Sequence, residues 1–149
     1  MREMSDYKSL VEQYYPSACN QVWDILKQAV PEGVVWEAEE VKNFVVEVYD
    51  FTISPKRIGG AFIKRAQEVT LRKGDTFIKF LPAGMAWVGI YGKIELITNK
   101  NIDNELLKKG IWFLGDEEKV FPVYPKKNEE DNYSLLSLEN LKELLQEIF

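Results

Sequence analysis

Six basic side chains in the middle of the chain are the residues best suited to bind an anionic partner. They are Lys56, Arg57, Lys64, Arg65, Arg72 and Lys73. With Lys79 they give residues 53–79 seven positive charges against Glu68 and Asp75, a net charge of +5, while the rest of the −5 chain carries −10. Lys and Arg neutralise phosphate groups, and a partner responds to the local potential. These six residues are therefore candidate phosphate-binding groups, although a basic loop region balanced by acidic helices explains the same charges.

Aromatic side chains near the expected strand ends could hold a base. Stacking of a base on an aromatic ring contributes about 1–3 kcal/mol. The candidate base pocket comprises Phe62, Phe80, Trp87 and Tyr91. Aromatic residues that alternate along a strand usually belong to the core, so packing is the alternative for each of them. Trp87 is the strongest candidate, because it lies opposite the apolar face of its expected strand.

The missing residue types argue against catalysis. The chain has no histidine and a single cysteine, Cys19. Serine and cysteine triads and His-ligated zinc are therefore excluded, and no Asp/Glu pair has the spacing of a two-metal site. We expect no enzymatic activity, no metal and no cofactor. Cys19 is expected to be buried and inert. The lone cysteine, the absence of a secretory leader and the lack of an apolar run of roughly 20 residues predict a cytoplasmic protein without a membrane span.

The elements that must position these side chains are those of an α+β domain. Residues 1–35 are predicted to be helical, with a second helix starting at Pro16. Strands are expected at 43–51, 76–81, 86–97, 111–114 and 119–124, and residues 61–70 as a short helix or irregular segment. Gly89 and Gly92 predict a bulge. A short helix should span 104–109, a charged loop 126–132, and Ser137 should cap the last helix.

About five strands with two faces to bury suggest a small bent β-barrel flanked by helices. The predicted organisation is one domain, 1–149, with a helical part at 1–35 and the barrel with its closing helix at 43–149. No interdomain linker or internal repeat divides the chain.

Several short motifs resemble the EVE branch of the PUA-like superfamily. They read IGGAF at 58–62, LRKGDTFIKF at 71–80 and WVGIYGKI at 87–94, and the tail carries VFPV at 120–123 and LSLENL at 136–141. The sequence departs from that family by having LPA at 81–83 instead of a Tyr-His-Ser-type strand end, and by its helical N-terminus. The resemblance implies a bent barrel with a pocket for a flipped or modified base. Such domains also occur as N-terminal DNA-targeting modules of McrB-type subunits in modification-dependent restriction systems.

The leading hypothesis is therefore a nucleic-acid-binding module that recognises a flipped or modified base, with DNA favoured over RNA. The resemblance further implies a larger chain or complex with motor and nuclease components. The alternative is a protein-interaction module without nucleic-acid binding, docking through the Leu-rich last helix or the N-terminal helices. A third hypothesis is a small-molecule-binding or minimal enzyme domain that uses carboxylates.

Overall fold

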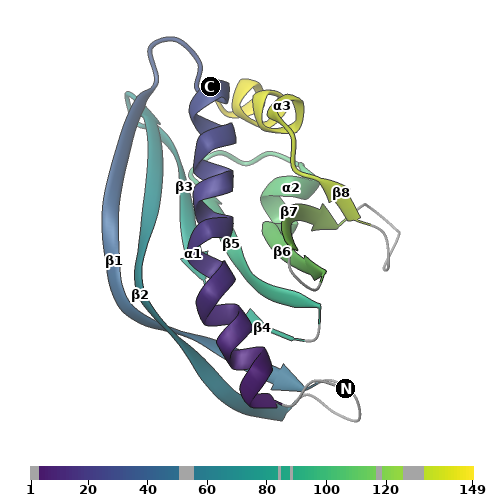
Figure 1. Ribbon diagram of the computed structural model, residues 1–149. Helices are drawn as coiled ribbons and strands as arrows, with labels where there is room; N and C mark the ends of the chain where they lie inside the picture. The colour runs from purple at the N-terminus through teal and green to yellow at the C-terminus, as the bar shows by residue number, and fades with distance from the viewer. Residues whose placement is uncertain (1–3, 51–55, 84, 88, 117–118, 126–132) are drawn as a thin grey trace.

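One long helix, α1 (Met4–Ala29), lies across one face of a curved sheet, with β1 and β2 to one side of it and β6–β8 to the other (Figure 1). The computed structural model describes residues 4–50, 56–83, 85–87, 89–116, 119–125 and 133–149. Within them the strands are β1 (Val35–Asp50), β2 (Lys56–Lys73), β3 (Thr76–Ala83), β4 (Met85–Ala86), β5 (Ile90–Thr98), β6 (Ile111–Asp116), β7 (Lys119–Pro125) and β8 (Tyr133–Leu135). No helix in these ranges is long and apolar enough to cross a membrane.

The α+β class is confirmed, but the predicted barrel is wrong. The strands form one sheet in the order β4-β1-β2-β3-β5-β6-β7-β8, antiparallel except for the short β1–β4 pairing. Across the described residues no pairing joins β4 to β8, so the sheet stays open. The physical reason is that α1 covers the inner face of the sheet, where the strands of a small barrel would pack against one another. Val11, Tyr15, Ala18, Val22 and Leu26 of α1 are fully buried.

The two predicted N-terminal helices are a single helix, with Pro16 in its interior. Proline has no N–H, so the carbonyl of Glu12 loses one helical hydrogen bond at this point. The helix continues because its buried residues before and after Pro16 lie on one stripe, which packs on the same sheet. Packing thus outweighs the local cost of the proline.

The segment expected to be irregular or helical at 61–70 is the middle of β2, which pairs with β1 along almost its whole length. Gly59 and Gly60, expected in a turn, pair with Val48 and Glu47. Within this strand Ala61 and Ile63 are buried and Phe62 and Lys64 are exposed. That alternation is the two-residue period of a half-buried strand. Pairing with β1 satisfies the backbone groups on one edge of β2, and the Phe62 N–H donates to Glu12 Oε2 of α1.

Tyr15 anchors α1 on the sheet through ring packing and hydrogen bonds. Its ring is fully buried and meets Phe44 and Phe113 edge to face, with centroids 5.7 and 5.3 Å away. Its hydroxyl lies 3.1 Å from the carbonyl oxygen of Lys93 and 3.3 Å from that of Ala83. A Cβ at Gly92 would lie only 2.3 Å from this ring, so glycine is required for the close approach. The β5–β6 register shifts between Ile90 and Lys93, which confirms the predicted bulge.

The helices after β5 agree with the sequence. Asn104 caps α2 (Glu105–Lys109), and Gly110 ends it. Ser137 caps α3 (Leu138–Ile148) and forms a capping box with Asn140. Leu141, Leu144 and Leu145 of α3 are buried in the core, so the apolar face of this helix is already occupied within the chain. The strand expected at 86–97 is instead divided into β4 and β5 by a tight turn in which Trp87 pairs with Ile90. The charged loop at 126–132 lies outside the described residues.

Candidate functional site

The basic residues of the predicted phosphate-binding set lie along β2, on both faces of the hairpin. Lys64, Arg65, Arg72 and Lys73 are all exposed. Lys64 and Arg72 share the outer face with Phe62, because their positions differ by even numbers along the strand. Lys56 and Arg57 pair with Asp50 and Tyr49 of β1, but their side chains lie outside the described part of the chain.

The acidic strand β1 balances much of this charge. β2 carries six Lys or Arg residues and one Glu, whereas β1 carries five Asp or Glu residues and one Lys, which leaves the hairpin with a net charge of +1. Arg65 Nε lies 3.3 Å from Glu40 Oε1, and Arg72 Nε lies 3.6 Å from Glu37 Oε1. These are exposed ion pairs, which contribute little stability and can exchange for another anion. The structure therefore provides accessible cations on a nearly neutral hairpin.

The four aromatic residues of the predicted base pocket differ in exposure. Phe62 is 46% exposed and lies beside Val45 on the outer face of the hairpin. Trp87 is half-buried and packs on Trp112, with ring centroids 5.1 Å apart.

The other two rings lie in the core. Phe80 is fully buried and meets Trp23 edge to face. Tyr91 is 4% exposed, stacks on Tyr14 and covers Gly115. Tyr91 directly follows Ile90, so a regular strand would place the two side chains on opposite faces, but both are buried at the bulge. In this conformation neither Phe80 nor Tyr91 presents a ring face to solvent, so only Phe62 and Trp87 can be reached by a base.

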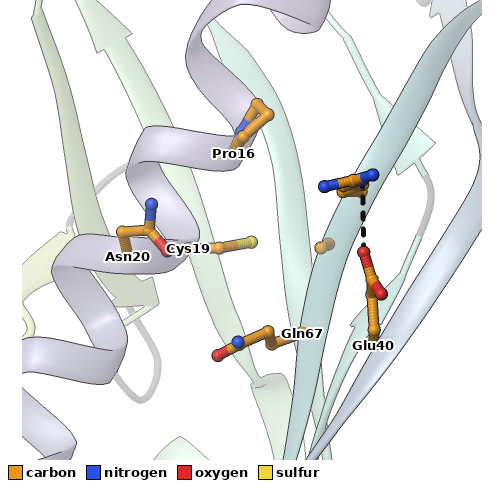
Figure 2. A pocket seen from close by; sticks show the side chains of 7 residues that line it. Pro16, Cys19, Asn20, Glu40 and Gln67 are labelled. Carbon is orange, nitrogen blue, oxygen red and sulfur yellow. Dashed lines mark ion pairs between the residues drawn. The ribbon is translucent and has the colours of Figure 1, made fainter.

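A pocket that the sequence did not indicate lies between α1 and the β1–β2 hairpin. Its volume is about 450 Å³, within the range of small-molecule sites. Pro16, Cys19 and Asn20 line it from α1, at the i, i+3 and i+4 spacing of one helix face. The hairpin contributes Glu40, Arg65, Ala66 and Gln67 (Figure 2).

The pocket coincides with an interruption of the apolar inner face of the hairpin. The cross-strand pairs Glu40–Gln67 and Lys42–Arg65 are polar, whereas the flanking pairs Ala38–Val69 and Phe44–Ile63 are apolar. All four pairs share one face of the sheet, since their positions differ by two. Asn43, between Lys42 and Phe44, has a φ of 56° and is left out of the regular pairing. This interruption is the sequence signal by which the pocket could have been found.

Cys19 lines the pocket but is not suited to act as a nucleophile. Its side chain is 1% exposed, and burial raises the pKa of the thiol to about 12, an effect that a hydrogen bond with Tyr15 partly opposes. Burial also raises the pKa of Tyr15 well above its ordinary value. Both groups are therefore protonated at neutral pH, and the reactive thiolate form of Cys19 is suppressed. The expectation that Cys19 is buried is confirmed.

No metal site accompanies the pocket in the part of the chain that the structure describes, where no group of three or more His, Cys, Asp or Glu side chains could hold a metal ion. In the comparisons with known proteins, no family model, curated protein or solved structure matches this chain. The resemblance to the EVE branch stays a prediction.

Proposed function

We propose that this chain is a non-catalytic domain that binds nucleic acid through the outer face of β2. The carrying observation is that Phe62, 46% exposed, is followed two residues later by the exposed Lys64 on the same face. An exposed ring can stack on an unpaired base, while neighbouring cations contact the phosphates. Arg72 extends the same face toward the other end of the strand.

The finer parts of the proposal follow from the family resemblance. They are recognition of a flipped or modified base, preference for DNA, a cytoplasmic location, and a place beside motor and nuclease components in a modification-dependent restriction system. The open sheet departs from the barrel that the resemblance implies, so these parts depend on the short motifs alone.

Fluorescence anisotropy with labelled oligonucleotides tests the proposal. The panel comprises unmodified, adenine-methylated and cytosine-methylated duplexes, single-stranded DNA and single-stranded RNA, at about 50 and 200 mM salt. Binding should weaken with salt. The double variant Lys64→Ala/Arg72→Ala should weaken it further and reduce the salt slope by about 2, one unit for each lost phosphate contact.

The matched control is Lys100→Ala/Lys142→Ala, which removes the same charge from exposed positions outside β2. An equal loss of affinity in both double variants would mean that net charge alone governs binding. Absence of binding to every oligonucleotide at low salt would rule out the proposed function.

One observation favours the alternative of a protein-interaction module. Val45 and Phe62 are cross-strand neighbours, 45% and 46% exposed, and form an apolar spot on the outer face of the hairpin. Aromatic and aliphatic side chains in such positions serve as anchors in protein interfaces. Sedimentation of the chain without nucleic acid distinguishes the two readings: self-association that Phe62→Ser abolishes would favour the interaction module.

A further inference from the structure

We infer that the pocket between α1 and the β1–β2 hairpin binds a neutral heterocyclic base, supplied either as a free nucleoside or as an unstacked base of a nucleic-acid strand. If the base belongs to a nucleic-acid strand, the inference rests on the proposed function; if it belongs to a free nucleoside, it does not. The site is distinct from the predicted base pocket, two of whose four rings are buried in the core.

Two uncharged amide side chains line the pocket, those of Asn20 and Gln67. Gln67 and Asn20 are exposed, and Gln67 belongs to the polar pairs Glu40–Gln67 and Lys42–Arg65 that interrupt the apolar inner face of the hairpin. An apolar pair in place of Glu40–Gln67 would extend the apolar pairing of Ala38 with Val69. Neither amide has a hydrogen bond to another described residue, so both are available to a ligand.

The charges of the lining favour a neutral ligand. Arg65 and Glu40 are the two ionised residues that line the pocket, and they are joined at 3.3 Å. Their charges cancel, so the lining has no net charge that would attract an ionic ligand. The second carboxylate oxygen of Glu40 lies 3.7 Å from the Nζ of Lys42, a further cation that does not itself line the pocket. If the base belongs to a nucleic-acid strand, its phosphate can stay in solvent outside the pocket, where a cation such as Lys42 can attract it.

The remaining groups match the edges of a base. A primary amide offers both a donor and an acceptor, as Asn20 and Gln67 do. Asn and Gln pair with adenine, Arg with guanine and Glu with cytosine through such edges. Pro16 adds apolar surface against which a planar ring can lie. A volume of about 450 Å³ accommodates a ligand of this size.

NMR titration tests the inference. ¹H–¹⁵N spectra are recorded with free adenosine, guanosine, cytidine and thymidine at millimolar concentration, and separately with a short single-stranded DNA. At least one nucleoside should move the side-chain amide signals of Asn20 and Gln67 saturably. The double variant Asn20→Ala/Gln67→Ala should lower the affinity for that nucleoside about tenfold or more, since two hydrogen bonds are lost.

The matched control is Gln21→Ala/Gln28→Ala, which removes two exposed amides from positions on α1 outside the pocket. It should leave binding unchanged. Because Asn20 and Gln67 are exposed, the test variant should keep its melting temperature, which is measured alongside.

The outcomes separate the inference from the proposed function. DNA binding that is equal in wild type and the Asn20/Gln67 variant, with no nucleoside response, would overturn the inference and leave the proposed function standing. Nucleoside binding in the pocket without any DNA binding would uphold the inference and overturn the proposed function. No response to either ligand would overturn both.

Discussion

Replacing Gly92 by alanine should strongly destabilise the protein, because Tyr15 occupies the space that the new methyl group needs. The added Cβ would lie 2.3 and 2.4 Å from Cε2 and Cδ2 of the Tyr15 ring. The ring cannot move aside, since Phe44 and Phe113 pack on it and its hydroxyl reaches the Lys93 and Ala83 carbonyls. Gly92 also has a φ of 143°, which L-residues rarely adopt.

The magnitude follows from two costs. Overpacking a well-packed core costs about 1–3 kcal/mol. A non-glycine residue in a sparsely populated backbone region costs about 1–3 kcal/mol more. The sum, about 2–6 kcal/mol, is a large part of the roughly 5–15 kcal/mol by which domains are usually stable.

Urea denaturation followed by far-UV circular dichroism measures this loss as a shift of the unfolding midpoint. Gly59→Ala is the matched control, because Gly59 also lies in a strand but has no atom within 4 Å of the added Cβ and no positive φ. It should change the free energy of unfolding by less than about 1 kcal/mol. Equal effects of the two substitutions would refute the placement of Tyr15 against β5, and with it the position of α1 that forms one wall of the pocket.

Two further predictions concern Cys19 and Ser137. Burial in the folded state raises the pKa of the Cys19 thiol to about 12, above the ordinary 9.0, so the unfolded chain loses this proton first as the pH rises. The contribution of this group to the free energy of unfolding should therefore be fully present below pH 9. It should fall by about 4 kcal/mol toward pH 12, because each pKa unit corresponds to 1.36 kcal/mol. Urea melts across this range should show a shallower loss for Cys19→Ala, and an unchanged slope would contradict the burial of the thiol. Ser137→Ala removes the cap of α3 and should lower the free energy of unfolding by about 1 kcal/mol, which thermal melting measures. The control is Ser134→Ala, a substitution of a half-buried serine outside the helix, which should lower it by less. Equal losses would contradict the capping role.

The parts of the fold that could be predicted are those with local signals. Asn104 and Ser137 are side chains that cap helices through their own oxygen atoms, and Gly110 ends a helix by its backbone freedom. The bulge at Gly92 was likewise signalled by a glycine within an apolar strand. Each of these features depends on a few consecutive residues, so the sequence carries it directly.

The errors arose where contacts distant in sequence decide the structure. Pro16 is a helix breaker in isolation, yet α1 continues through it because the helix packs on the sheet on both sides. Residues 61–70 have weak strand propensity, and pairing with β1 makes them a strand. Closure into a barrel could not be judged without knowing that α1 covers the inner face of the sheet.

The sequence predicted the basic and aromatic residues of the binding face on β2, but not the pocket between α1 and the hairpin. The exposure of Lys64 and Phe62 agrees with a binding face, whereas Phe80 is buried because its position in β3 points toward α1 and Trp23. Asn20 and Gln67 are 47 positions apart in the chain and meet only through the packing of α1 on the hairpin. The sequence signal of the pocket, the polar pairs Glu40–Gln67 and Lys42–Arg65, can be recognised only after β1 and β2 are aligned.

The most direct test of the account is an NMR titration of the full chain with single-stranded and duplex DNA at low salt, followed by assignment of the signals that move. We predict saturable shifts at Phe62 and Lys64 of β2, together with Asn20 and Gln67 of the pocket. Shifts confined to α3, or no saturable shift with either DNA, would contradict it.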